Sequence, residues 1–203
     1  HAEEEYTTTG LNHRKLLMWV FLGSDCMFFG ALIATYMVYR GQSLNGPYPV
    51  DIIDVPITTI STFVLLCSSF SMVQALSATN RNDQKGIRIW LMTTAILGAI
   101  FIGFQIFEFT TFYKEGLTLG ANLFGATFFT LTGFHGAHVT LGIVWLLVMF
   151  VLALKGRLGP STSLDVEILG LYWHFVDIVW IVIFTLLYLI GGFDVGPVPP
   201  SGG

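Results

Sequence analysis

The sequence predicts an all-α fold of the polytopic membrane class, a bundle of five transmembrane helices. Of its 203 residues, 54% are hydrophobic and only 11% are charged, whereas a soluble domain carries roughly a quarter charged residues. The mean hydropathy is +0.72. Such a chain cannot cover itself with a solvated surface. Five apolar stretches are each long enough for the ~20 residues that cross a ~30 Å hydrocarbon core.

The five predicted helices follow one another in a single membrane domain that comprises residues 1–203. They run over about 16–39, 55–77, 88–112, 123–154 and 165–190. Connectors rich in Gly, Pro and Asn end the first four helices, at 40–54, 77–86, 113–122 and 155–163. No stretch alternates with period two, which argues against the short strands of a membrane β-barrel. Residues 191–203 are rich in Gly and Pro and are predicted to form an irregular tail.

The distribution of Lys and Arg predicts how the chain is oriented, because short cytoplasmic loops carry an excess of these residues. With the N-terminus in the cytoplasm, seven basic residues lie inside: Arg14, Lys15, Arg81, Lys85, Arg88, Lys155 and Arg157. Arg40 and Lys114 then lie outside. We therefore expect a cytoplasmic N-terminus and an outer C-terminus.

Ionisable residues within the predicted helices are costly to insert and are therefore candidate functional residues. Asp25 lies about nine residues into the first helix, or ~14 Å at 1.5 Å per residue, close to the middle of the membrane. We expect a proton-linked role for it, whether the carboxyl is neutral or stays ionised in a wet cavity.

The other polar residues of the membrane segments lie on the last three predicted helices. They are Gln105, Glu108, His135, His138, Glu167, His174 and Asp177. Spacings of three or seven residues bring those of each helix to one side of that helix. They predict a polar network between helices, in which His174 and Asp177 pair with groups on the third and fourth helices, or contacts with lipid. A purely structural role in holding the bundle together explains Gln105, Glu108 and Glu167 equally well.

The sequence gives no sign of a metal or heme site. A heme held by two histidines needs ligands on facing helices at matched depth, and the H-x-x-H pair His135 and His138 lacks a neighbouring Cys or clustered carboxylates. Cys26 and Cys67 lie within apolar segments and are expected to be free thiols. No nucleophile motif, phosphate-binding loop or basic patch is present, so we expect no catalytic residue and no nucleic-acid binding.

Two smaller expectations concern packing. Gly133, Gly136 and Gly142 are expected to let another backbone or a lipid chain come close to the fourth helix. Tyr172 is expected to lie near a helix end as an interfacial anchor, as are Trp19 and Trp90.

Four segments together resemble subunit III of the heme–copper terminal oxidases, the cytochrome c oxidase subunit 3 family. They are LGSDCMFF (22–29), GFQIFEF (103–109), TFFTLTGFHGAHVTLGIVWLL (127–147) and EILGLYWHFVDIVWIVIFTLLYL (167–189). Their order is that of the family, and the resemblance covers nearly the whole chain. The chain resembles the shorter, five-helix bacterial form, which lacks the first two of the family's seven helices.

The resemblance implies an accessory subunit in a bacterial plasma membrane. Hemes and copper would belong to the partner subunits I and II, and this chain would carry none. It would support proton uptake and the stability of subunit I, and it would bind structural phospholipid in a cleft. Asp25 would then face subunit I. Helices of subunit I could replace the two missing helices as the other wall of the cleft.

The electron donor stays open, because the Asp of SDC (24–26) resembles quinol-oxidising members as well as some bacterial cytochrome c oxidases. Cytochrome c and quinol are both candidate partners, acting through the complex. Two other classes compete with this interpretation. A small transporter or channel would use the buried carboxylates and imidazoles as its path, but no inverted repeat or broken helix is evident. A pure assembly protein would leave proton uptake unaffected.

Overall fold

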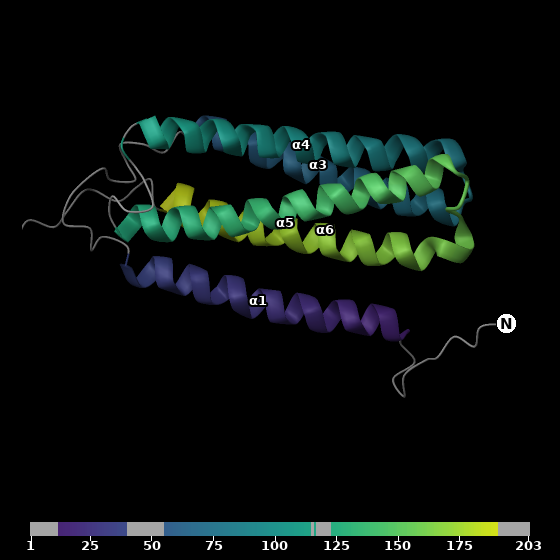
Figure 1. The fold of residues 1–203 in the computed structure, drawn as a ribbon, viewed down its shortest axis with the longest axis horizontal. Helices are drawn as coiled ribbons and strands as arrows, with labels where there is room; N and C mark the ends of the chain where they lie inside the picture. Colours follow the sequence, from purple (N-terminus) through teal and green to yellow (C-terminus); the bar gives the residue numbers. More distant parts are fainter. Residues whose placement is uncertain (1–11, 40–54, 115, 117–122, 191–203) are drawn as a thin grey trace, which may run out of the picture.

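The computed structural model describes residues 12–39, 55–114, 116 and 123–190, and five long helices account for most of them (Figure 1). These are α1 (His13–Tyr39), α3 (Val55–Asn80), α4 (Gln84–Lys114), α5 (Leu123–Leu154) and α6 (Ser163–Ile183). A short 3₁₀ turn, Pro160–Thr162, precedes α6, and a π-helix, Phe184–Ile190, continues it. The predicted tail, 191–203, lies outside the described residues, as does Arg40.

All five helices are long and apolar enough to span a membrane, counting Pro160–Ile190 as one span, which confirms the predicted helical class and the number of spans. Helices α3, α4, α5 and α6 pack into one group, and α1 lies along one side of it against α5 and α6 (Figure 1). The outer surface is apolar: Met27 and Leu17 are 81% and 71% exposed. Side chains of this kind are stable in such number only against lipid or a partner protein.

The polar turns lie together at one end of the bundle. Between α3 and α4, Asn82 adopts a φ of 55°, and the Asp83 carboxylate accepts hydrogen bonds from the first backbone N–H groups of α4. The Gln84 amide donates to the carbonyl of Leu158, at 2.6 Å, and so joins this turn to the connection between α5 and α6. The four helices α3–α6 are thereby held in register at that end.

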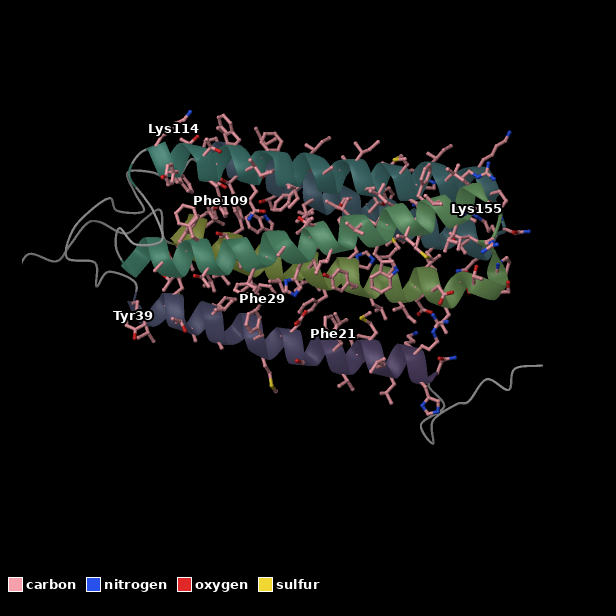
Figure 2. All side chains as sticks on the ribbon, in the orientation of Figure 1. Phe21, Phe29, Tyr39, Phe109, Lys114 and Lys155 are labelled. Carbon is pink, nitrogen blue, oxygen red and sulfur yellow. The ribbon has the colours of Figure 1, made fainter. Side chains whose placement is uncertain are left out.

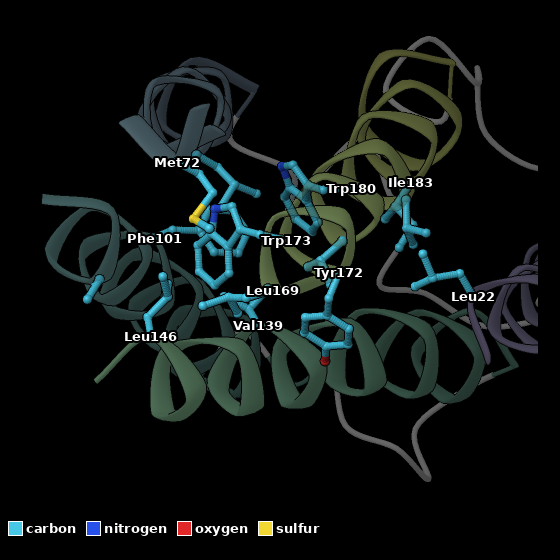
Figure 3. Close-up of a cluster of buried hydrophobic side chains, with 14 of the residues drawn as sticks. Leu22, Met72, Phe101, Val139, Leu146, Leu169, Tyr172, Trp173, Trp180 and Ile183 are labelled. Carbon is cyan, nitrogen blue, oxygen red and sulfur yellow. The ribbon is translucent and has the colours of Figure 1, made fainter. Parts of the chain in front are cut away.

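The centre of the bundle is an indole ring of α6. Trp173 is fully buried among other large side chains (Figure 3). Its ring lies against Gly98 of α4 and Gly142 of α5. Its Nε1–H donates to the hydroxyl of Ser68 on α3, at 3.0 Å. One side chain therefore contacts all three other helices of the group. Trp180 repeats the contact with α3 two turns later, where its Nε1–H donates to Thr62 at 2.9 Å.

Two glycines of α5, Gly136 and Gly142, make room for side chains, which corrects the expectation that a backbone or a lipid chain comes close to them. A Cβ at Gly142 would lie 2.8 Å from the ring of Trp173, and one at Gly136 would lie 2.8 Å from Gln105 Oε1. Gly133 has nothing within 4 Å of such an atom. The small residues of α5 thus admit large residues of α4 and α6.

The glycine at position 98 supplies a test of this packing. A Cβ there would lie 2.7 Å from Trp173 Cη2, so we expect Gly98→Ala to destabilise the purified chain by about 1–3 kcal/mol through overpacking. Gly103→Ala on the same helix is the matched control, since nothing lies within 4 Å of that position. It should be neutral or slightly stabilising, because alanine favours helix. Thermal unfolding in mild detergent measures both, and equal midpoints for the two variants would contradict the packing described.

Candidate functional site

Asp25 and His138 face each other across the contact between α1 and α5. His138 Nε2 lies 3.3 Å from Asp25 Oδ2, and the two side chains are only 17% and 14% exposed. Phe29, one turn after Asp25, packs its ring edge-on against the imidazole, with 5.1 Å between ring centroids. Figure 2 shows Phe21 and Phe29 directed from α1 toward the rest of the bundle. The pair lies midway along α1, at the depth expected for the middle of the membrane.

The hydrogen bond at the other ring nitrogen of His138 indicates which nitrogen carries a proton. His138 Nδ1 lies 2.8 Å from the carbonyl oxygen of Phe134, which can only accept, so Nδ1 carries a proton. Asp25 Oδ2, 3.3 Å from Nε2, does not meet hydrogen-bond geometry with any described residue. A proton shared between the imidazole and the carboxyl would make this contact favourable and the pair neutral as a unit.

Tyr172 of α6 forms a hydrogen bond with the backbone of His138. Its hydroxyl donates to the backbone carbonyl of His138 at 2.9 Å, and its ring stacks near that of Phe21. Tyr172 is buried, so its expected place as an interfacial anchor is wrong. The tyrosine instead joins α6 to the turn of α5 that carries His138.

His135 occupies the core, one turn away on α5. It is 0% exposed, stacks on Trp180 at 4.8 Å and packs edge-on against Phe101. Neither ring nitrogen has a hydrogen-bond partner among the described residues. Beside it, Gln105 of α4 donates from Nε2 to the carbonyl of Thr132 at 2.7 Å, while its buried Oε1 lacks a partner in the same part of the chain. His135 therefore lies in the core of the bundle and His138 at the contact between α1 and α5, although they are only three residues apart.

Glu108 joins three elements at the opposite end of the bundle from the polar turns. Its two carboxylate oxygens accept from Thr58 of α3 at 2.8 Å and from Tyr188 at 3.1 Å. Tyr188 belongs to the π-helix that ends the last span. Two hydroxyl donors on separate elements provide the stabilisation that a carboxylate needs at this depth.

The three predicted residues of α6 do not form one network. Glu167 pairs with Lys15 at the start of α1, at 2.5 Å, next to a second pair between Arg14 and Asp165. His174 Nδ1 lies 2.5 Å from the Ser69 hydroxyl of α3, the second predicted helix. Its expected partners were on the third and fourth helices, and this expectation is wrong because the relevant face of α6 packs on α3.

Asp177 is 3% exposed, and neither of its oxygens has a hydrogen-bond partner among the described residues. Among the described residues, Asp25 Oδ2 likewise lacks a partner of hydrogen-bond geometry, although His138 Nε2 lies 3.3 Å from it. Glu108 and Glu167 have hydroxyl donors and a lysine, respectively.

The sequence indicated the carboxyl and imidazole groups of the site but not their hydrogen-bond partners. Ser69, Thr58 and Tyr188 were not singled out, although a run of hydroxyl residues on α3 (61–71) was visible as a signal. Within the described ranges, no group of three or more His, Cys, Asp or Glu residues is placed to hold a metal ion. Cys26 and Cys67 are free thiols, the former exposed and the latter half-buried.

Comparison with known proteins agrees with the motifs. The family model described as cytochrome c oxidase subunit III matches residues 4–192. Quinol oxidase subunit 3 of Bacillus spizizenii and that of Bacillus subtilis are each 40% identical over 191 residues, 94% of both chains. Cytochrome c oxidase subunit 3 of Bacillus sp. PS3 is 34% identical over 190 residues, 94% of this chain and 92% of that protein. This chain belongs to the cytochrome c oxidase subunit III family.

Proposed function

We propose that the chain is the non-catalytic subunit III of a proton-pumping heme–copper terminal oxidase. Subunits I and II hold the hemes and copper, and subunit I reduces O₂ to water. Membership of the family and the names of relatives of both donor types support this assignment. The chain itself supplies support for proton uptake and for the stability of subunit I.

The proposed role in proton uptake is supported by the contact between Asp25 and His138. The imidazole lies 3.3 Å from the carboxyl, close enough to share a proton with it, and 14% of the Asp25 side chain is still exposed. Beside an imidazole, a buried carboxyl can be ionised at lower cost than alone, because the proton that it releases to the ring leaves the pair without net charge. On the assembled oxidase, Asp25 would face subunit I.

Structural phospholipid is the second part of the proposal. A shallow apolar groove of about 340 Å³ runs along α5 between Val144 and Leu152. At the end of α5 that carries the polar turns lies a partly polar pocket of about 230 Å³, lined by Arg14, Trp145 and Asp165. An acyl chain fits the first by its chemistry, and a charged headgroup fits the second. These features support a lipid along α5.

The orientation with a cytoplasmic N-terminus, in a bacterial plasma membrane, is part of the same proposal. The start of α1, the turn between α3 and α4 and the connection between α5 and α6 lie together at one end of the bundle (Figures 1 and 2). These segments carry or adjoin Arg14, Lys15, Arg88 and Lys155. That clustering supports the positive-inside assignment. The relatives named above are bacterial.

Cytochrome c and quinol are both candidate electron donors. Relatives of the two types cover this chain almost equally, but the identity is 40% to the quinol oxidase subunit of Bacillus subtilis and 36% to the cytochrome c oxidase subunit of the same species. This difference is the reason to test quinol as an electron donor beside cytochrome c.

The oxidase assignment is tested by purifying a tagged chain in gentle detergent. We expect co-purifying subunits with heme bands in the visible spectrum, and oxygen uptake supported by cytochrome c or by quinol, which decides the donor. A colourless preparation without oxidase activity, under conditions that preserve membrane complexes, would contradict the assignment and favour a transporter.

The Asp25–His138 pair is tested with Asp25→Asn and Asp25→Glu. The Asn amide can donate to His138 Nε2 and keep the contact, but it cannot release a proton in exchange. We expect Asp25→Asn to lower sustained turnover and proton uptake severalfold while subunit III stays bound, and Asp25→Glu to restore both. Glu167→Gln, which changes only a partly exposed pair with Lys15, is the matched control and should leave turnover unchanged.

These measurements are stopped-flow proton uptake and oxygen consumption by the purified complex, with subunit content checked on a gel. Full turnover and proton uptake in Asp25→Asn would contradict the proton-linked role. Loss of subunit III from that variant would assign the pair to assembly instead.

A further inference from the structure

An apolar groove lies on the outer surface of α3 and α4, on other helices than the lipid groove proposed along α5. Its volume is about 440 Å³, which is within the range of small-molecule sites. It is called the α3–α4 groove below, and every residue that lines it is apolar. The lining residues are Ile57 of α3 and Ile100, Gly103, Phe104 and Phe107 of α4.

The groove exists because α4 has no side chain at position 103. A Cβ at Gly103 would have no heavy atom within 4 Å, whereas one at Gly98 would lie 2.7 Å from Trp173. Gly98 therefore admits a side chain of the bundle, and Gly103 admits none from the described residues. Phe107 lies at the edge of the groove and is 60% exposed. The groove is thus open to whatever surrounds the bundle at this depth.

The groove and the helix end beyond it extend over one half of the membrane. Helix α4 comprises Gln84–Lys114, so Ile100 lies near its midpoint and Lys114 lies at its end, ~21 Å farther at 1.5 Å per residue. Half of a bilayer with its headgroup layers is ~20–22 Å thick. A lipid of one leaflet extends over the same distance, from the headgroup layer to the middle of the membrane.

A cation lies on the same face of α4 as the groove, at the headgroup level. At 100° per residue, Lys114 and the four groove residues of α4 fall within an arc of ~100°. Lys114 is exposed, and Figure 2 shows its side chain directed away from the bundle. None of the ion pairs within the described ranges includes it. Its ammonium group can therefore pair with the phosphate of a lipid, since lysines near a membrane surface attract anionic headgroups.

We propose that the α3–α4 groove binds one molecule of an anionic phospholipid, with an acyl chain against Gly103 and the phosphate paired with Lys114. The groove and the cation match the polarity of such a lipid, which is apolar along its chain and negatively charged at its head. The inference goes beyond the proposed function. Only the assignment of this lipid to the outer leaflet rests on the orientation proposed above.

Photolabelling by lipid tests the site. The complete chain, in the complex with which it purifies, is reconstituted into phosphatidylcholine nanodiscs. These contain phosphatidylglycerol or, at the same mole fraction, phosphatidylcholine with a diazirine at the same position of one acyl chain. Adducts are mapped by mass spectrometry of peptides. Bulk lipid labels the chain equally from both probes, whereas we expect phosphatidylglycerol to label residues 100–107 severalfold more.

Two pairs of variants test the groove and the cation separately. Gly103→Phe fills the groove, and should lower labelling of residues 100–107 by phosphatidylglycerol to the level given by phosphatidylcholine. Ile106→Phe adds the same ring at an exposed position of α4 that does not line the groove, and should leave the labelling unchanged. Lys114→Gln should lower the preference for phosphatidylglycerol about fivefold, the effect of one lysine at a membrane surface. Lys114→Arg keeps the cation and should retain the preference.

Three results would overturn the proposal. Equal labelling of residues 100–107 by the two probes would indicate bulk lipid only. Labelling by neither probe would indicate that another protein subunit covers the groove. A preference for phosphatidylglycerol that persists in Lys114→Gln would exclude the pairing with Lys114. Each result is obtained whether or not heme co-purifies, so a failure of this site is distinguishable from a failure of the oxidase assignment.

Discussion

The packing of the Trp173 indole against Gly98 and Gly142 is the contact on which the other positions depend. It brings α4 and α5 within reach of α6, and its hydrogen bond to Ser68 adds α3. Tyr172 then lies behind His138, His174 reaches Ser69, and Trp180 covers His135. Two glycines and one tryptophan thus determine which helices the flanking polar residues of α6 can touch. In a membrane this shape fit matters more than in water, because apolar side chains gain little by leaving lipid.

The polar groups within the spans fall into two kinds. Glu108 and Glu167 each have donors or a cation within the chain, so they hold elements of the bundle together. Asp25 and Asp177 each have an oxygen without a partner of hydrogen-bond geometry in the described part of the chain, and Asp25 faces the imidazole of His138. The cost of burying polar groups in hydrocarbon makes the second kind informative, since such groups are stable only with a proton, water or a neighbouring protein.

This division agrees with an accessory subunit better than with a channel. A permeation path needs polar groups that continue from one side of the membrane to the other, whereas Asp25, His135 and Asp177 lie at similar depth on different helices. The apolar outer surface leaves ample area for contacts with other subunits.

The sequence by itself determined the class of fold, the number of spans and the family, because long apolar stretches and motifs such as FHGAHV are local properties of the chain. It also singled out the carboxyl and imidazole groups of the bundle interior, since a charge in an apolar segment is visible without a structure. Only the tertiary structure decided the partners. Helical periodicity places Glu167, His174 and Asp177 on one side of α6, but it cannot tell that this side meets Lys15 of α1 at one level and Ser69 of α3 at another. Which helix faces which depends on the fit of Trp173 between two glycines, and that fit involves three helices far apart in sequence.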